Sequence, residues 1–160
     1  MNLRIGNGYD VHKLADGDEI LLCGVRIPHN KKLLGHSDAD VAMHALTDAI
    51  FGSLCEGDIG VHFPPTDKKW KDANSEIFLK KALSLMTKHR YLINNLDLTI
   101  ICESPKIKLS SLAMRTNLAR LCQIKIDQVS IKGTTSERLG FTGREEGIAA
   151  IATVLIKKNE

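Results

Sequence analysis

The chain has 160 residues, of which 43% are hydrophobic and 26% are charged, with 22 Lys and Arg against 19 Asp and Glu. This length suffices for one domain with a hydrophobic core, whereas two domains would each be marginal. A net charge of +3 and an aromatic content of 4% argue against a nucleic-acid or membrane partner. We therefore expect one globular domain over residues 1–160.

The cysteine pattern bears on the compartment of the cell. Cys23, Cys55, Cys102 and Cys122 lie far apart without a C-x-x-C pair, so neither a thiolate zinc site nor a redox motif is indicated. Each has apolar neighbours and is interpreted as a small core residue. Because reduced thiols fit the cytosol, and because no signal peptide or membrane-spanning run is evident, we expect a cytoplasmic location.

The first half of the chain predicts two strands and a helix. Residues 3–10 and 19–27 have the composition of strands. Apolar residues recur at helical spacing over residues 38–54, with Ser37 placed as the N-terminal cap. Residues 56–72 form a long polar loop, and loops of that length inside a compact domain are more often functional than idle.

The second half predicts two more helices, three strands and one long loop. The helices cover residues 75–90 and 109–122, the strands cover 96–103, 128–133 and 148–156, and a Gly- and Thr-rich loop covers 133–147. The resulting order, β-β-α-α-β-α-β-β, predicts an α/β or α+β fold in which helices pack on one face of a sheet.

A candidate metal site begins with Asp10 and His12. Residues two apart on a strand point the same way, so the two side chains should project together while Val11 turns inward. An Asp-x-His pair is a natural two-ligand clamp for zinc. Taken alone, such a pair is more often an ordinary feature of the surface.

His44 strengthens the metal hypothesis, because it lies in the middle of the helix predicted over residues 38–54. Asp40 and Asp48 lie one turn before and after it, where carboxylates could orient the imidazole and raise its basicity. Asp10, His12 and His44 would leave a fourth tetrahedral position open, as in a catalytic zinc site. The simpler alternative is a solvated polar helix face with a hydrogen-bonded His44.

The loop after the strand at 128–133 carries the second candidate site. Thr134, Thr135 and Ser136 follow Gly133, and their backbone and hydroxyl donors could bind phosphate. Glu137 offers the kind of oxygen ligand that Mg²⁺ takes beside substrate phosphates. The Walker spacing G-x-x-x-x-G-K is absent, and a turn rich in Thr and Ser explains the same residues equally well.

Motifs along essentially the whole chain resemble those of the 2-C-methyl-D-erythritol 2,4-cyclodiphosphate synthase family. The motifs are Gly8-Tyr9-Asp10-Val11-His12, Gly35-His36-Ser37-Asp38-Ala39-Asp40 with His44 and Ala45, Leu46-Thr47-Asp48-Ala49, Gly57-Asp58-Ile59-Gly60, Phe63-Pro64-Pro65-Thr66-Asp67, Pro105-Lys106 and Leu139-Gly140-Phe141-Thr142-Gly143-Arg144. The Ser-Asp-x-Asp-x-x-x-His and Leu-Gly-Phe-Thr-Gly-Arg blocks are together highly specific.

The resemblance implies an enzyme of the non-mevalonate isoprenoid pathway, a cyclising phosphorus–oxygen lyase. Its implied substrate is 4-diphosphocytidyl-2-C-methyl-D-erythritol 2-phosphate, and the products are the 2,4-cyclodiphosphate and CMP. The resemblance further implies Zn²⁺ and a second metal, Mg²⁺ or Mn²⁺, as cofactors. It implies a homotrimer whose active sites lie between chains.

The resemblance also assigns roles to individual residues. It implies zinc ligation by Asp10, His12 and His44, to which the helical spacing adds Asp48 in support, a second metal at Glu137, and transition-state stabilisation by His36 and Thr135. Residues 102–108 and 133–135 match a cytidine pocket. The full set of implied substrate contacts is Asp10, His12, His36, Ser37, Asp58, Ile59, Gly60, Phe63, Pro64, Pro65, Thr66, Asp67, Cys102, Glu103, Ser104, Pro105, Lys106, Ile107, Lys108, Gly133, Thr134, Thr135, Ser136, Glu137, Phe141 and Arg144.

Four positions depart from the family pattern. Asn7 stands where His is common, Ala39 where Gly is usual, and Ser136 where a third Thr is expected. Pro65 stands where the family often has Asp, so a polar substrate contact is missing there or is supplied by Asp67.

Two other functions are compatible with the same residues. A zinc-dependent phosphohydrolase would hold an attacking hydroxide at the open metal position and would need a neighbouring general base. A non-catalytic module that binds a nucleotide ligand would bind without metal and would show no turnover.

Overall fold

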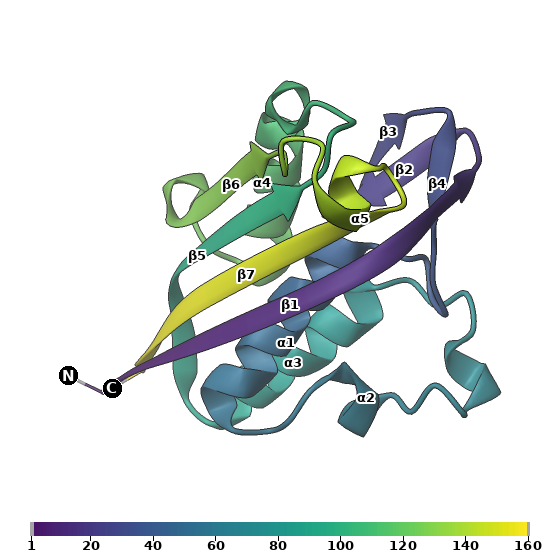
Figure 1. The fold of residues 1–160 in the computed structure, drawn as a ribbon. Helices are drawn as coiled ribbons and strands as arrows, with labels where there is room; N and C mark the ends of the chain where they lie inside the picture. The colour runs from purple at the N-terminus through teal and green to yellow at the C-terminus, as the bar shows by residue number, and fades with distance from the viewer. Residues whose placement is uncertain (1, 160) are drawn as a thin grey trace.

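Five strands form one mixed sheet in the order β4-β1-β7-β5-β6 (Figure 1). The computed structural model describes residues 2–159. β7 runs antiparallel to both β1 and β5, whereas β5 and β6 are parallel. The strands are β1 (Leu3–Asp16), β4 (Lys31–Leu34), β5 (Tyr91–Ile101), β6 (Val129–Thr134) and β7 (Gly147–Lys158).

The strand predicted over residues 19–27 is two strands, so that prediction was wrong. β2 (Glu19–Leu22) and β3 (Val25–Pro28) form a separate antiparallel hairpin. Its turn residues Cys23 and Gly24 both have positive φ, 52° and 74°. Positive φ at both central positions is the type I′ geometry that suits a two-residue hairpin. The turn escaped detection because Cys23 extends the apolar run.

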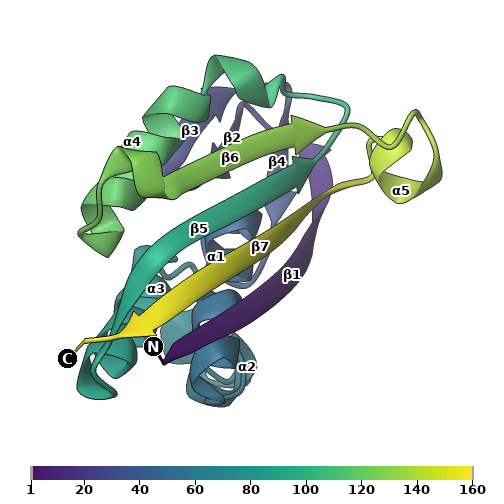
Figure 2. The ribbon, with the colours of Figure 1, turned by 90° about the vertical axis from the view of Figure 1, so that its left-hand side faces the viewer.

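Helices cover one face of the sheet, as predicted. They are α1 (Val41–Leu54), α3 (Glu76–Lys88) and α4 (Ser111–Cys122). Figure 2 shows the short α5 (Gly140–Gly143) on the opposite side from α3 and α4. The predicted element order was incomplete, because four strands precede α1 and α5 interrupts the final loop. The loop over 56–72 likewise contains the single turn α2 (Ile59–His62) and a 3₁₀ turn over Lys68–Trp70.

Two glycines of β1 let α1 approach the sheet closely. A Cβ atom at Gly6 would lie 1.8 Å from the carbonyl oxygen of Ala49, and one at Gly8 would lie 2.0 Å from that of Ala45. No larger residue fits at either position without moving the helix. This close packing fixes the position of His44 on α1 relative to the strand that carries the other candidate ligands.

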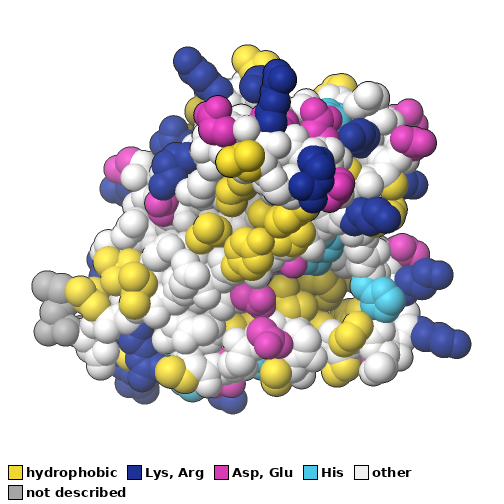
Figure 3. All heavy atoms as spheres, in the orientation of Figure 1, with side chains coloured by type: hydrophobic (Ala, Val, Ile, Leu, Met, Phe, Trp, Pro, Cys, Tyr) yellow, Lys and Arg dark blue, Asp and Glu magenta, His cyan; other side chains and the backbone are white. Residues whose placement is uncertain are grey.

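Alternate residues of β1 face opposite sides of the sheet. Gly6, Gly8 and the candidate ligands share the face under α1, whereas Tyr9 and Val11 point to the open face, where 56% and 38% of their surface is exposed. The predicted inward orientation of Val11 was therefore wrong. Figure 3 shows hydrophobic side chains gathered on this open face over β1 and β7.

Two smaller expectations concern the cysteines and the membrane. Cys23, Cys102 and Cys122 are buried, as predicted, but Cys55 is exposed. Cys55 ends α1 in a left-handed conformation, which places its side chain outside the helix packing. Within residues 2–159, none of the helices has the length and hydropathy needed to cross a membrane.

Candidate metal centre and substrate pockets

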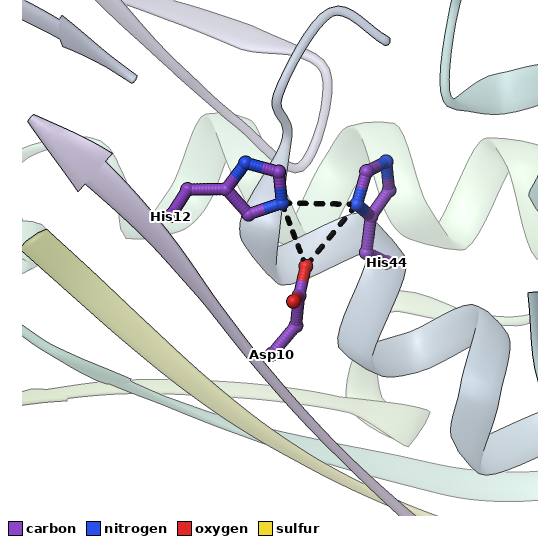
Figure 4. A group of neighbouring side chains, drawn as sticks. All are labelled: Asp10, His12 and His44. Carbon is purple, nitrogen blue, oxygen red and sulfur yellow. Dashed lines mark hydrogen bonds and ion pairs between the residues drawn. The ribbon is translucent and has the colours of Figure 1, made fainter. Parts of the chain in front are cut away.

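Asp10, His12 and His44 converge on one point (Figure 4). Oδ2 of Asp10 lies 2.8 Å from Nε2 of His12 and 3.1 Å from Nδ1 of His44, and the two nitrogens are 3.2 Å apart. All three side chains are half-buried, and one ligand atom from each lies within 4.8 Å of the others. The predicted projection of Asp10 and His12 from one face of β1, toward His44 on α1, is confirmed.

The electrostatics of this cluster favour an ionised carboxylate beside the two rings. Burial by itself would raise the pKa of Asp10, but hydrogen bonds and charge from His12 and His44 outweigh it and hold that pKa well below its usual range. Burial lowers the pKa of His12, yet hydrogen bonding and charge from Asp10 raise it overall. An anionic oxygen and two imidazoles thus share a site of limited solvent access.

Asp48 and Asp40 were predicted to support His44, but their hydrogen bonds go elsewhere. Oδ1 of Asp48 accepts the backbone N–H of Ile59 at 2.8 Å, which ties α1 to α2. Within the described residues, the ring of His44 forms hydrogen bonds through Nε2 to the hydroxyls of Ser37 and Ser75, each at 2.9 Å. Ser75 comes from the loop before α3 and was not identified from sequence.

Asp40, not Ser37, caps the N-terminus of α1, so the predicted cap was wrong. Its carboxylate accepts backbone N–H groups from Met43 and from the β2–β3 turn, Cys23 and Gly24, at 2.6–2.9 Å. Burial raises the pKa of Asp40 to about 6, against the lowering effect of these three donors. Asp40 therefore joins the helix to the hairpin and does not contact His44 through its side chain.

A cavity of about 250 Å³ opens beside the candidate ligands. It is lined by predicted residues, namely His12, His36, Ser37, His44, Ile59, Gly60, Phe63 and Pro65, and by two residues that were not predicted, Trp70 and Phe78. The ring of Phe63 packs 4.7 Å from Trp70 and 4.6 Å from Phe78 between centroids. Three of the few aromatic residues thus gather here, a feature that only the folded chain reveals.

Residues of the predicted 56–72 loop line one side of this cavity, and two acidic residues of the loop cap its short helical turns. Asp58 caps α2 by accepting the N–H of Val61 at 3.0 Å, and Asp67 caps the 3₁₀ turn. The imidazole of His36 donates through Nε2 to the carbonyl oxygen of Pro65 at 2.8 Å. The residue that departs from the family pattern therefore still contacts a candidate catalytic side chain, through its backbone.

The predicted cytidine pocket corresponds to a second cavity of about 460 Å³. Its lining includes Cys102, Pro105, Lys106, Ile107, Lys108, Gly133, Thr134 and Thr135, together with Ser111, Ile131 and Lys132, which were not predicted. Nζ of Lys106 donates to the carbonyl of Glu103 at 3.2 Å. Burial raises the pKa of Cys102 to about 11, so this thiol stays protonated at neutral pH.

Eleven of the predicted substrate contacts are outside the lining of both cavities, namely Asp10, Asp58, Pro64, Thr66, Asp67, Glu103, Ser104, Ser136, Glu137, Phe141 and Arg144. Glu137 is exposed with a φ of 55°, and Phe141 lies on α5. Arg144 forms an ion pair with Glu146, its Nε lying 2.9 Å from Oε1. The hydroxyl of Ser136 donates to the carbonyl of Leu139 at 2.8 Å, a hydrogen bond within the same loop.

The two cavities have no lining residue in common within residues 2–159. A third and larger one, about 670 Å³, lies between α3 and the end of α4 and contains none of the predicted site residues. The metal cluster and the candidate nucleotide pocket are therefore separate features of one chain.

The cluster suits a divalent metal by its donor set. One carboxylate and two imidazoles, each imidazole with its second nitrogen held by a hydrogen bond, are the ligands that zinc takes in open catalytic sites. A mixed sheet with such a cluster beside one cavity, and hydroxyls and lysines around another, defines the class of protein: an α/β enzyme with a candidate metal centre.

Comparison with known proteins identifies the family. The model of the YgbB family matches residues 3–157. A 2-C-methyl-D-erythritol 2,4-cyclodiphosphate synthase of Cereibacter sphaeroides is 60% identical over 98% of both chains. A bifunctional enzyme IspD/IspF of Rhodobacter capsulatus is also 60% identical, but this chain spans only 41% of its length. The chain belongs to the YgbB family.

A solved structure of IspF from Plasmodium falciparum, a CDP complex, is 36% identical to this chain. It superimposes with a TM-score of 0.89 and covers 99% of this chain and 98% of its own. The likeness therefore extends to the whole fold described above.

Proposed function

We propose that this chain converts 4-diphosphocytidyl-2-C-methyl-D-erythritol 2-phosphate into 2-C-methyl-D-erythritol 2,4-cyclodiphosphate and CMP, a step of isoprenoid precursor biosynthesis. An oxygen of the 2-phosphate forms a bond to the β-phosphorus, and the bond from that phosphorus to the CMP oxygen breaks. No water is consumed. The observation that carries the proposal is the 60% identity over 98% of both chains with a synthase named for this product.

Residues around the larger of the two site cavities bind the cytidine diphosphate part of the substrate. Support comes from the relative that was solved as a CDP complex, and from the cavity of about 460 Å³ at the ends of β5 and β6. Lys106 and the hydroxyls of Thr134 and Thr135 provide a cation and hydrogen-bond donors for the diphosphate. The 2-phosphate and the erythritol part lie toward the cavity lined by His36 and Ser37.

The cluster of Asp10, His12 and His44 supports a metal site, and the second site is proposed from the resemblance alone. Asp10, His12 and His44 hold Zn²⁺, and Glu137 holds Mg²⁺ or Mn²⁺. When bound, such ions supply positive charge and Lewis acidity to phosphate oxygens. The low pKa of Asp10 keeps its carboxylate ionised, which supports ligation at neutral pH.

The remaining residues position the substrate and offset its charge. Unit charges ~4 Å apart repel by ~4 kcal/mol at an effective dielectric of 20, so the crowded phosphates need nearby cations such as Lys106 and Arg144. His36, held by the carbonyl of Pro65, and Thr135 stabilise the transition state. Holding attacker and leaving group in line supplies much of the rate, and no residue acts as a covalent nucleophile.

We further propose that residues 1–160 act as one cytoplasmic domain that assembles into a homotrimer. Two observations support the assembly. The open face of the sheet carries exposed apolar residues, among them Ile5 at 68% and Tyr9 at 56% exposure. The metal cluster and the nucleotide pocket have separate linings, which is expected if each pairs with its counterpart on a neighbouring chain.

Product analysis tests the activity directly. The protein is incubated with the cytidine diphosphate substrate in ¹⁸O-labelled water, with and without EDTA, and followed by ³¹P NMR. We expect CMP and an unlabelled cyclic diphosphate, both lost with EDTA. Label in the phosphate product would identify a hydrolase, and metal-independent binding without turnover would identify a binding module.

The metal assignment is tested on the ligands. His44→Ala should lose most bound zinc and most activity while staying folded, because α1 buries its own apolar face. His89→Ala, which removes an exposed imidazole paired with Glu56, is the matched control and should keep one zinc per chain. Full zinc content in the His44 variant, measured by elemental analysis, would overturn the assignment.

A further inference from the structure

Each candidate imidazole ligand has one nitrogen directed at the cluster and one held by other groups. Nδ1 of His12 lies 2.9 Å from the carbonyl oxygen of Leu34, to which it must donate, so Nε2 is left to face Asp10. His44 is oriented the other way round, with Nδ1 toward Asp10 and Nε2 toward the hydroxyls of Ser37 and Ser75. A hydroxyl can donate or accept, so these contacts alone leave the tautomer of His44 open.

Asp38 resolves that ambiguity through Ser75. Oδ2 of Asp38 accepts the backbone N–H of Ser75 at 2.9 Å, and Oδ1 accepts the Ser75 hydroxyl. Because a carboxylate only accepts, the hydroxyl proton must point to Asp38. The Ser75 oxygen can then only accept from His44, which places the ring proton on Nε2 and leaves Nδ1 unprotonated toward the cluster.

The hydroxyl of Ser75 is committed to this contact with Asp38 and His44. Ser75 is fully buried and stands at the N-cap position of α3, yet its hydroxyl makes no capping hydrogen bond to that helix. A serine at an N-cap ordinarily satisfies a backbone N–H of the first turn. Here the hydroxyl goes to Asp38 and His44 instead, and the side chain of Asn74 accepts the backbone N–H of Glu76 at 2.8 Å in the first turn.

Ser37 contacts the same nitrogen from a different position. Ser37 lines the cavity beside His44, whereas Ser75 does not. A bound substrate can therefore recruit the Ser37 hydroxyl, while Ser75 keeps its hold on the ring. Ser37 is thus available to contact the substrate, whereas Ser75 holds the His44 ring.

We propose that Ser75, oriented by Asp38, is a positioning residue that fixes the tautomer and rotation of His44 and so presets Nδ1 as a metal ligand. The inference rests on the metal site of the proposed function. Outer partners of ligand imidazoles typically change metal affinity by about 10–100-fold when removed.

The test measures zinc affinity, not turnover. Zinc dissociation constants are obtained by competition with a chromophoric chelator for the wild type, Ser75→Ala, Ser37→Ala and Ser53→Ala. Ser53 is the matched control, because its buried hydroxyl donates to the carbonyl of Ile50 on α1 away from the cluster. We expect about 10–100-fold weaker binding for Ser75→Ala and a smaller loss for Ser37→Ala, because only Ser75 is itself held by a carboxylate. The control Ser53→Ala should stay within about threefold of wild type.

Asp38→Asn tests the same series of hydrogen bonds, from Asp38 through Ser75 to His44, at the Asp38 end. Asparagine offers one acceptor oxygen where Asp38 receives donors on two, so it cannot hold both the N–H and the hydroxyl of Ser75. The Asp38→Asn variant should bind zinc more weakly than wild type. The Ser75→Ala/Asp38→Asn double variant should bind zinc no more weakly than whichever single variant has the lower affinity. Losses that multiply in the double variant would contradict a common path through Ser75.

The outcomes separate the inference from the function on which it rests. A wild-type protein without zinc affinity would overturn the metal assignment. Zinc binding by wild type that Ser75→Ala leaves unchanged would overturn the inference alone. If thermal melting shows that metal-free Ser75→Ala is unfolded, Asp38→Asn decides, and unchanged affinity in that variant would overturn the inference as well.

Discussion

Individual residues that depart from the family pattern have local partners in this chain. Asn7 donates through Nδ2 to the carbonyl of Ala152 at 3.1 Å and to the hydroxyl of Thr153 at 3.0 Å, which links β1 to β7 on the open face. Ala39 has a φ of 61°, a conformation that glycine adopts without steric cost, and this explains why glycine is usual there. Both departures are therefore accommodated without a change in the candidate ligands.

Glu137 provides a prediction at the residue scale. Its side chain is exposed beside the Thr134–Ser136 run, and in the proposed function it would hold a second divalent metal that supplies positive charge to the substrate phosphates. Glu137→Gln should lose most Mg²⁺-stimulated turnover and keep its zinc, as read from initial rates over a Mg²⁺ titration and from elemental analysis. Glu145→Gln, another exposed glutamate with positive φ, is the control. Wild-type Mg²⁺ dependence in the Glu137 variant would remove it from the metal site.

At the scale of elements, the capping carboxylate of Asp40 connects α1 to the β2–β3 hairpin. Asn is as good an N-cap as Asp, but it cannot accept on both side-chain atoms, so the N–H of Gly24 would lose its partner. Asp40→Asn should therefore lower the free energy of unfolding by about 2 kcal/mol, measured by urea denaturation.

Asp67→Asn is the matched control for that experiment. Asp67 also caps a helical turn, through the N–H of Lys69, but it is exposed and holds no second element. Its replacement should change stability by less than about 0.5 kcal/mol. Equal effects of the two substitutions would mean that the contact to the hairpin contributes nothing.

The contact between β1 and α1 gives a second prediction for elements. Gly6→Ala would drive a methyl group into the carbonyl of Ala49, and overpacking of this kind costs about 1–3 kcal/mol. Gly52→Ala on α1 meets only the carbonyl of Asn7, at 3.8 Å, and removes a poor helix former. It should stabilise by about 0.5–1 kcal/mol. If the free energy of unfolding changes in the same direction in both variants, this account is contradicted.

At the scale of the whole molecule, the proposed shared active site can be tested by mixing. His44→Ala damages the zinc half, and Lys106→Ala with Glu137→Gln damages the nucleotide half. Each protein alone should be nearly inactive. In a head-to-tail ring, random co-assembly joins two intact halves at roughly a quarter of the interfaces, so about that fraction of wild-type activity should return. No recovery after co-refolding would mean that each site lies within one chain.

Most of the fold could be predicted from residue patterns because long helices and strands have a recognisable hydrophobic periodicity. The three main helices lie within two or three residues of their predicted positions, and the last strand extends as expected. The patterns failed where a turn was built from apolar residues, as at Cys23 and Gly24, and where one helical turn was too short for periodicity, as in α2 and α5. Short elements depend on tertiary contacts, which no local window contains.

The sequence by itself determined the convergence of Asp10 and His12, because alternation along a strand is a property of the backbone, and it determined the family through its motifs. Only the tertiary structure decided what surrounds His44. Spacing along α1 suggested Asp40 and Asp48, but their carboxylates accept backbone N–H groups of the β2–β3 hairpin and of α2. The ring nitrogen instead meets Ser75, which lies 31 residues away in the chain, because hydrogen bonds in a fold are assigned by position in space.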